Sequence, residues 1–393
     1  MRKIDYYLGR PLCAFLTLIE KSRKIRKPKK IKRILFIELS EMGSTILMYN
    51  ALKRVKKDYP EATLYFLIFE KNKESLYLTN QIAKNNIITI KSKSLKNFLF
   101  STIKTLIKIK KLKFDIVFDM ELFSRFTAIL TYVSNAPNRV GFSNYTNEGL
   151  YRGNLFTKEV WYNPYQHIAQ NFLNMVDASS RKNENDKINH KSKNDNALEY
   201  YKLKYSKEKI KKIKDKNIKL IKSYDPGQKI ILINPDGGVL PIRSWPLENY
   251  IDLLKKLEKN YNLLIIGKGR TAKDSAIKIK SKIKSNKVTD LTNKTNFKEL
   301  IDLFFISDVL IGNDGGLAHF ATLSKIKIIT FFGPETPKLY GPLSENAINI
   351  YNNFSCSPCL TAYNHRKTKC TNQKCLKTIK VDEVYRTIII SLK

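Results

Sequence analysis

The feature that most constrains the fold is an alternation of short apolar runs with helical segments, which occurs once in each half of the chain. In the first half, residues 33–39 and 63–69 have the composition of buried strands, and residues 45–57 have helical periodicity. Residues 40–44 predict a turn, and FDIVFDMELF at 114–123 predicts a further strand. Parallel strands need crossover connections, so we expect strand–helix–strand units with ligand-binding loops at the carboxyl ends of the strands.

The second half repeats this alternation after a polar stretch rich in Lys, Asn and Ser. Strands are predicted at 229–238, 261–270, 308–316 and 326–333, and helices at 246–260 and 296–307. Two such halves predict an α/β protein with two Rossmann-like domains facing a central cleft.

The predicted divisions follow the changes in composition. A basic amphipathic segment is expected at 1–32, a first domain at 33–176, a charged linker or helical insertion at 177–225, and a second domain at 226–393. No G-x-G-x-x-G follows the first strand and no P-loop lysine motif is present, which disfavours a nicotinamide enzyme and a P-loop NTPase.

The chain is strongly basic, with 72 Lys and Arg against 35 Asp and Glu, a formal net charge of +37. One interpretation is a solvated lysine-rich surface, and the other is an anionic partner such as a membrane leaflet or a phosphorylated glycan. Nucleic acid is disfavoured, because neither a helix-turn-helix pattern nor an aromatic-basic ribonucleoprotein signature is visible.

The first residues do not read as a secretory signal, because Arg10 and Pro11 interrupt a short apolar run and no small-residue cleavage site follows. We therefore expect a cytoplasmic location. Residues 1–33 carry 12 basic side chains against two acidic ones. Apolar residues fall at helical spacing, namely Leu8, Leu12, Phe15, Leu16 and Ile19. The segment predicts either peripheral binding to an anionic membrane or packing on the protein's own core.

GNDGGLAH at 312–319 overlaps the end of the strand predicted at 308–316. Gly315 and Gly316 allow backbone N–H groups to approach an oxyanion, and the helix that follows offers its positive N-terminus. The pattern predicts a cradle for a diphosphate.

Five blocks in order carry a family resemblance over residues 33–390: ILFIELSEMGSTIL, FD with NRVGF, INPDGG with RSWPLENY, DLTNKTNFKELIDLFFISDVLIGNDGGLAH, and FFGPETP. The chain resembles glycosyltransferase family 9, the heptosyltransferase family of lipopolysaccharide core assembly. The resemblance implies a GT-B fold and transfer of a sugar from a nucleotide donor to a glycolipid, with inversion and without a metal. It also implies that the first domain binds the acceptor and the second binds the nucleotide.

The resemblance implies roles for residues of the second domain. Asp314 stands where the family contacts sugar or ribose hydroxyls, Gly315 and Gly316 line the pyrophosphate, and His319 lies one helical turn deeper. Family members usually have Ser or Thr at position 315, so glycine here removes one hydroxyl donor. Arg243 matches a position that neutralises the donor phosphates. The open alternatives are a helix-packing role for His319 and a surface role for Arg243.

The first domain departs from the family at its catalytic position. Active members usually carry Asp directly after the glycine of the first block, as the base that takes the acceptor proton, and this chain has Ser44 there. Serine alone is a poor general base. Glu38, Glu41 and Glu121 lie near the same strand ends, and we favour Glu41 or Glu121 as the base. Arg125, Arg139 and Lys53 are candidates for acceptor phosphates or, equally, plain structural cations.

Four of the five cysteines follow the FFGP block as C-x₂-C-x₁₀-C-x₄-C, with His365 between the two pairs. The ligands of this pattern would be Cys356, Cys359, Cys370 and Cys375. Structural zinc, free or reversibly oxidised thiols, and disulfides are open alternatives. No cofactor is expected for catalysis.

We therefore predict a glycosyltransferase at the cytoplasmic membrane face, moving a sugar such as heptose from an ADP-sugar to a lipopolysaccharide core or related glycolipid. Two alternatives stay open. A catalytically silent glycan- or nucleotide-sugar-binding protein would explain Ser44, and an epimerase-like enzyme would act on a free nucleotide sugar.

Overall fold

The computed structural model describes residues 2–20, 30–122, 124–143, 150–180, 198–238 and 240–393. The chain divides into two compact units: the first comprises 1–199 and 361–367, and the second comprises 200–360 and 368–393. Residues 21–29 of the predicted basic segment and 181–197 of the predicted linker lie outside the described residues.

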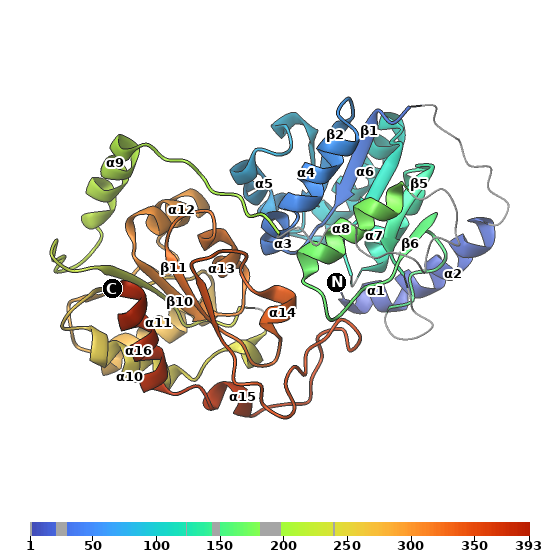
Figure 1. The fold of residues 1–393 in the computed structure, drawn as a ribbon. Coiled ribbons are helices and arrows are strands. Elements are labelled where there is room, and N and C mark those ends of the chain that lie inside the picture. Colours follow the sequence, from blue (N-terminus) through green and yellow to red (C-terminus); the bar gives the residue numbers. More distant parts are fainter. Residues whose placement is uncertain (1, 21–29, 123, 144–149, 181–197, 239) are drawn as a thin grey trace. The chain divides into compact units, whose positions relative to one another are not determined.

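The first unit is built on a six-stranded parallel sheet in the order β3-β2-β1-β4-β5-β6 (Figure 1). The strands are β1 (Arg33–Ile37), β2 (Thr63–Phe69), β3 (Ile87–Ile90), β4 (Ile116–Asp119), β5 (Asn138–Phe142) and β6 (Lys158–Val160). The helices are α1 (Arg2–Tyr7), α2 (Gly9–Glu20), α3 (Met42–Leu47), α4 (Tyr49–Asp58), α5 (Glu74–Thr79), α6 (Leu95–Leu112), α7 (Arg125–Val133) and α8 (Ile168–Ser179), with 3₁₀ turns η1 (Glu70–Asn72) and η2 (Lys84–Asn86).

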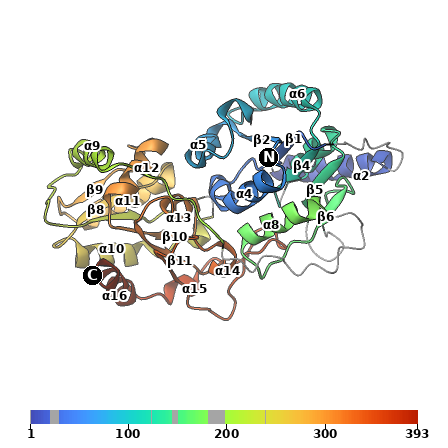
Figure 2. The same ribbon diagram turned by 45° about the horizontal axis from the view of Figure 1, so that its top comes forward.

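Helices cover both faces of this sheet, so its central strands are apolar on both sides, as parallel strands usually are. Figure 2 shows α6 on one side and α4 with α8 on the other. On the α6 side, Leu35 and Val117 of the central strands pack with Ile109 of α6 and Leu130 of α7. Pairs of stacked rings, such as Phe36 with Phe118, pack neighbouring strands together.

The N-terminal helices support both interpretations of the basic segment in part, because one side packs on the protein and other residues stay exposed. Cys13 of α2 is fully buried, and Leu16 packs beside it against Ala128 and Tyr132 of α7, so part of the helix belongs to the protein's own core. The other predicted apolar positions, however, remain exposed: Leu8, Leu12, Phe15 and Ile19. Among the described residues, no helix is long and apolar enough to cross a membrane.

The second unit is built on another six-stranded parallel sheet, in the order β12-β11-β10-β7-β8-β9. Its strands are β7 (Ile230–Asn234), β8 (Asn262–Ile265), β9 (Val288–Asp290), β10 (Val309–Asn313), β11 (Lys327–Phe331) and β12 (Ala347–Ile350). Its helices are α9 (Lys207–Ile218), α10 (Leu247–Leu257), α11 (Arg270–Lys282), α12 (Phe297–Ile306), α13 (Gly316–Ala321), α14 (Pro337–Tyr340), α15 (Lys374–Lys377) and α16 (Val381–Leu392), with the 3₁₀ turn η4 (Pro241–Arg243).

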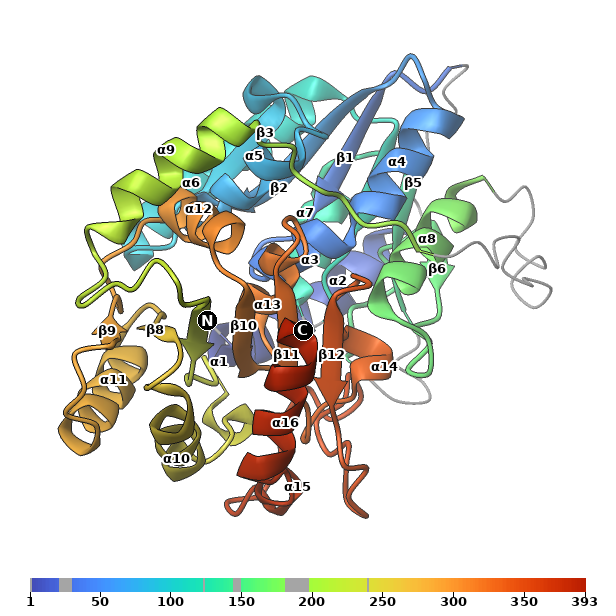
Figure 3. The ribbon, with the colours of Figure 1, turned by 60° about the vertical axis from the view of Figure 1, so that its left-hand side comes forward.

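The core of the second unit lies between its sheet and α10, α11 and α16. Trp245 and Tyr250 sit at its centre, in ring contact with each other and with Phe331 of β11. Figure 3 shows α16 beside α10, where Val384 and Ile388 complete this core.

The two units divide between residues 199 and 200, inside the predicted linker or helical insertion. α8 continues to Ser179 within the first unit, and the second unit begins at Tyr200. α9, in the predicted linker, packs on α12, and Tyr205 just before it stacks on Phe305 with ring centroids 4.0 Å apart. Most of the described linker is therefore part of a folded unit.

Both sheets have the same topology. Read from its β9 edge, the second sheet has the order β9-β8-β7-β10-β11-β12, which repeats the 3-2-1-4-5-6 order of the first. The order reverses between β1 and β4 in the first unit and between β7 and β10 in the second. The prediction of two Rossmann-like α/β domains is confirmed, and each unit has a switch point where such sheets bind ligands.

Candidate functional site

Glu121 shapes the first switch point from the end of β4. Its Oε1 accepts hydrogen bonds from the backbone N–H groups of Leu39 (2.9 Å) and Ser40 (3.0 Å) and from the Ser40 hydroxyl (2.6 Å). The side chain is buried, with the residue 6% exposed. Glu121 therefore holds the loop after β1 in place, an arrangement that suits a structural carboxylate better than a base that must meet substrate.

Glu38 lies beneath the same loop and is 3% exposed. Its Oε1 accepts from the backbone N–H of Glu41 at 3.2 Å. Burial raises the pKa of Glu38 well above its usual range, and the neighbouring charges of Glu121 and Glu41 raise it further. Relative to an exposed glutamate, the neutral carboxyl form of Glu38 is therefore stabilised.

Glu41 is the exposed member of the group. It precedes α3, and its side chain is 42% exposed. The hydroxyl of Ser44 donates to Glu41 Oε2 at 3.2 Å, and the guanidinium of Arg366 donates to Oε1 at 2.5 Å. Ser44 lies inside α3 rather than in the predicted turn, one helical turn after Glu41. A carboxylate therefore contacts the very side chain that stands where the family resemblance implies Asp.

Arg366 reaches Glu41 from a distant part of the sequence. It belongs to residues 361–367, which group with the first unit although the chain on both sides belongs to the second. His365 and Arg366 both adopt left-handed backbone conformations, with φ of 54° and 52°. Such conformations are unfavourable for residues other than glycine and persist where surrounding contacts hold them. In the same segment, Tyr363 forms an edge-on ring pair with Tyr162.

A buried ion pair supports the end of β4. Arg152 pairs with Asp119 and also donates to the backbone carbonyl oxygens of Ser124 (3.0 Å) and Phe142 (3.1 Å). Burial raises the pKa of Asp119 to about 7, against the opposing charge of Arg152. These contacts tie β4, β5 and the start of α7 together beneath the candidate base.

The cations predicted to bind acceptor phosphates have other partners. Arg139 is 1% exposed and donates to Glu20 and to the carbonyl oxygens of Leu155 and Ala136. Arg125 is also buried, with NH1 3.5 Å from Asp5. Both placements disfavour the predicted acceptor role and indicate that these arginines fasten α1 and α2 to the unit.

Lys53, the third candidate cation, is exposed. Its ammonium group contacts both carboxylate oxygens of Glu199, at 2.6 and 2.7 Å.

At the second switch point, Arg243 and Asp314 come together from η4 and the end of β10. Arg243 NH1 lies 3.2 Å from Asp314 Oδ2, and the two side chains are 15% and 6% exposed. Arg243 Nε is buried without a hydrogen-bond partner among the described residues. The guanidinium thus keeps donor capacity at the carboxyl edge of the sheet, as binding of an anion requires.

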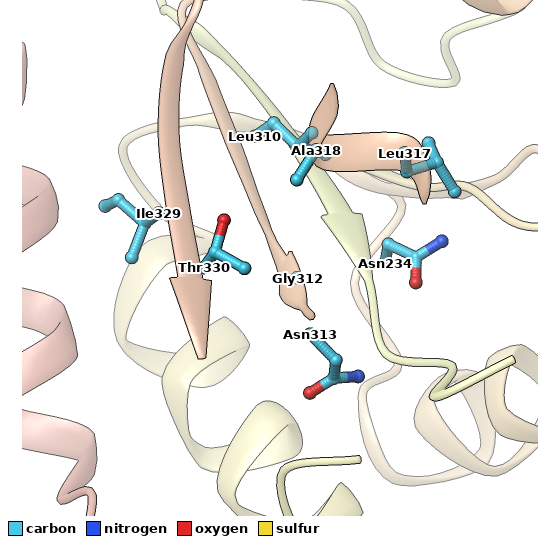
Figure 4. Close-up of a pocket in the computed structure, with 8 residues that line it drawn as sticks. All are labelled: Asn234, Leu310, Gly312, Asn313, Leu317, Ala318, Ile329 and Thr330. Atoms are coloured by element: carbon cyan, nitrogen blue, oxygen red, sulfur yellow. The ribbon is translucent and has the colours of Figure 1, made fainter. Parts of the chain in front are cut away.

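Asn313 was not predicted as a site residue, and it supports the segments next to Arg243 and Asp314. Its Oδ1 accepts from the backbone N–H of Trp245 at 2.8 Å and from the hydroxyl of Tyr250 at 3.1 Å. Figure 4 shows Asn313 at the tip of β10, with Asn234 on the adjacent β7. Between α13 and the strands β7, β10 and β11 lies a cavity of about 10 Å³, which is the size of one water molecule and too small for any substrate. A polar residue ending a buried strand is the only sequence signal for Asn313.

Gly315 and Gly316 begin α13 as predicted. Gly315 has an extended backbone, with φ of 174°, and a Cβ there would meet only the carbonyl oxygen of Asn313, at 3.8 Å. The conformation therefore does not demand glycine, and a Ser or Thr fits at this position. His319 lies in α13 and is 7% exposed, close behind the loop.

The cysteine cluster contains no disulfide; all four residues are free thiols, two exposed and two less so. Burial raises the pKa of the Cys359 and Cys375 thiols, which disfavours the thiolate form. Among the described residues, His, Cys, Asp and Glu form no group of three or more that could hold a metal ion. The four cysteines are therefore not gathered as zinc ligands in this structure. Bound zinc stays a prediction, which metal analysis of the purified protein would test.

Known proteins share this sequence pattern. The sequence model of glycosyltransferase family 9 (heptosyltransferase) matches residues 103–370. Lipooligosaccharide heptosyltransferase 2 of Campylobacter jejuni is 27% identical over 180 residues, which are 45% of this chain and 55% of that protein. The chain thus spans about half the length of the curated relatives it matches.

Solved structures share the fold. The ADP-heptose LPS heptosyltransferase II of Escherichia coli has a TM-score of 0.67 at 15% identity, covering 92% of this chain and 98% of that one. A glycosyltransferase family 9 protein from Veillonella parvula has a TM-score of 0.68 at 20% identity, covering 92% and 97% of the two chains. These similarities confirm the predicted GT-B fold class.

Proposed function

This chain belongs to glycosyltransferase family 9, and from that premise we propose that it transfers heptose from ADP-heptose to a lipopolysaccharide core or related glycolipid. The observation that carries the proposal is the pairing of a half-exposed carboxylate with Ser44 at the first switch point. The donor proposal draws on the E. coli structural relative, an ADP-heptose LPS heptosyltransferase II.

The second unit holds the donor. The guanidinium of Arg243, which contacts Asp314, binds the diphosphate, and Asp314 accepts from sugar or ribose hydroxyls while orienting Arg243. The backbone N–H groups of Gly315 and Gly316 complete the phosphate contacts. Negative charge that develops on the departing ADP is stabilised by these donors.

Glu41 is the proposed general base. It accepts the proton of the acceptor hydroxyl, whose oxygen bonds to the anomeric carbon as the bond to the ADP oxygen breaks and ADP leaves with the electron pair. A single displacement inverts the configuration at that carbon and needs no metal. Ser44 and Arg366 each hold one oxygen of the Glu41 carboxylate and thereby fix its orientation.

Calorimetry with ADP and ADP-heptose tests the donor site. We expect micromolar binding of one adenine nucleotide, weakened about tenfold or more, or about 1.4 kcal/mol, by Arg243→Ala or Asp314→Ala. Arg270→Ala is the matched control, because Arg270 is exposed and ion-paired only at the surface of the same unit. Unchanged affinity in both site variants would remove the donor assignment.

Turnover separates the enzyme from a silent binder. With donor and a lipopolysaccharide core acceptor, we expect ADP release, an inverted glycosidic bond by NMR, and the same rate after chelation with EDTA. Tight donor binding with no ADP release above the buffer rate would favour the silent binding protein, the alternative that Ser44 motivates.

We also propose that the protein works at the cytoplasmic face of an anionic membrane. The exposed Leu8, Leu12, Phe15 and Ile19 of the N-terminal helices support this, together with the basic residues of the segment. The acceptor, a glycolipid, would lie in that membrane.

A further inference from the structure

α6 exposes an apolar stripe along its outer side. Leu95, Leu99, Ile103 and Ile107 recur at every fourth position and are 54–64% exposed, and Phe100 beside them is 73% exposed. The inner side of the same helix packs into the core through Ile109 and Thr105. One apolar side of α6 is thus buried in the protein, and the second apolar side is exposed. An exposed apolar side of this kind is typical of a surface that binds a partner.

The charge around this stripe has one sign. Lysines occupy positions 91, 93, 96, 104, 108, 110, 111 and 113, and no acidic residue occurs between Glu74 and Asp115. In the part of the chain that the structure describes, the lysines of α6 take part in no ion pair. Exposed apolar side chains flanked only by lysine match an anionic lipid surface and disfavour a basic copy of the same chain.

The first turn of α6 is linked to α1 through the start of α7, which follows Glu121 in the chain. Asp5 of α1 accepts from the backbone N–H groups of Arg125 (3.3 Å) and Phe126 (2.9 Å), the first residues of α7. The ring of Phe126 in turn contacts Phe98 in the first turn of α6, with centroids 5.2 Å apart.

These contacts gather the first turns of α6 and α7 with α1, next to the loop of Glu121. The apolar rim is defined here as the exposed apolar side chains at the N-terminus and along α6: Ile4, Tyr7, Leu8, Leu95, Leu99, Phe100, Ile103 and Ile107.

We propose that the apolar rim inserts into an anionic bilayer, with α6 as a second contact beside the N-terminal helices, and so holds the first switch point at the membrane surface. The proposal rests on the proposed function, because it gives a lipid-linked acceptor a short path from its bilayer to Glu41. An α6 helix buried only on its inner side has no other evident use for its outer stripe.

Co-sedimentation of the full chain with vesicles tests this. Phosphatidylcholine alone is compared with phosphatidylcholine mixed with phosphatidylglycerol, for wild type and for the double variant Leu99→Glu, Ile103→Glu. We expect wild type to bind only the anionic vesicles, and the double variant to bind them about tenfold more weakly or worse. Ile277→Glu, at an exposed apolar position on α11 of the second unit, is the matched control and should bind as wild type does.

Equal binding of wild type and double variant to anionic vesicles would overturn the proposal. So would a concentration-dependent dimer in sedimentation velocity that the double variant abolishes while neither protein binds vesicles, because the rim would then join two copies. Circular dichroism of the double variant shows whether it is folded, and Lys96→Glu with Lys104→Glu is a second test that leaves the apolar stripe intact.

Vesicle binding requires no turnover, so its failure is distinct from failure of the proposed function. Where transfer is observed, the double variant should keep the wild-type rate on a lipid-free core oligosaccharide and lose rate on the same acceptor embedded in anionic vesicles. Equal loss on both acceptors would contradict a membrane role for α6.

Discussion

At the switch point of the first unit, between β1 and β4, the side chains are carboxyl groups: Glu38, Glu41 and Glu121. At the same topological position of the second unit, between β7 and β10, an arginine and an aspartate stand beside a glycine pair. The two sheets share one strand order, so topology alone decides where each site lies. The loop residues then decide the chemistry, a proton acceptor in one unit and an anion holder in the other.

The two sites also differ in how much of the hydrogen-bonding capacity of their side chains is used by contacts within the protein. In the first unit, Glu38 and Glu121 are buried, and each accepts hydrogen bonds from backbone N–H groups of the loop after β1. Glu41 is therefore the most accessible carboxylate of the three. In the second, Arg243 keeps an unfilled N–H beside Asp314. Each unit therefore offers one group to substrate and uses its neighbours to aim that group.

The largest expected effect separates the two sites. Glu41→Gln should lower kcat by about 10²–10⁴-fold, the usual contribution of a general base, with nucleotide affinity unchanged. Glu70→Gln, a half-buried glutamate after β2 of the same sheet, is the control. Full activity of Glu41→Gln would show that another residue is the general base, and would contradict the roles proposed for the two sites.

A smaller effect is expected at Arg366, which positions Glu41 without touching substrate. Arg366→Ala should lower kcat by about tenfold through the loss of orientation, and Arg366→Lys should restore part of it by supplying the charge. Steady-state kinetics with calorimetry of ADP binding checks this. Weaker nucleotide binding in Arg366→Ala would indicate that the arginine serves the donor instead.

In the second unit, Gly315→Ser should sharpen the anion site. The extended backbone accepts a side chain there, and one added hydroxyl donor should tighten ADP binding by about two- to tenfold, the worth of one net hydrogen bond. Gly315→Ala, which adds the Cβ without the hydroxyl, should bind as wild type does. Loss of affinity in both variants would mean that the nucleotide approaches closer than the loop geometry indicates.

The smallest effect concerns stability in the first unit. The pKa of Glu38 is raised in the folded chain, so folding binds a proton and the free energy of unfolding falls as pH rises above about 4.5, the value of an unburied glutamate. Glu38→Gln removes this dependence, and its melting temperature relative to wild type should rise by about 2–4 °C between pH 5 and pH 8, as about 1 kcal/mol would produce. Exposed Glu74→Gln is the control, and a pH-independent difference for Glu38→Gln would contradict a protonated Glu38.

Much of the fold was readable from periodicity. β2 is predicted at 63–69 and found there, and the six segments predicted in the second half overlap β7, α10, β8, α12, β10 and β11. The elements β9, α11, β12 and α16 were not predicted. The helix start was less readable: α3 begins at Met42, inside the predicted turn, because a short buried helix lacks a long amphipathic repeat. The predicted linker or helical insertion contains α9, whose place in the fold was not readable from composition. The packing of α9 on α12 depends on contacts far away in the chain, whereas its own composition is that of a solvated segment.

At the two sites, the residue types indicated the kind of chemistry, but the surroundings of each side chain determine the role that it can take. Glu41 and Glu121 were equivalent candidates by sequence, and only burial and hydrogen bonding separate them. By sequence, Arg125 and Arg139 were equally candidates for acceptor phosphates and plain structural cations, and in the structure each is buried and paired with one carboxylate of the first two helices. Arg366 gave no local signal, because its partner Glu41 lies 325 residues earlier.

The sequence by itself determined the two α/β units, their parallel sheets, the family and the glycine-containing loop after β10, because these follow from local periodicity and contiguous motifs. Only the tertiary structure decided which carboxylate remains open, which cations are already neutralised, and which helix faces stay uncovered. Those properties depend on desolvation and on contacts between residues tens to hundreds of positions apart, and a linear pattern does not specify such contacts.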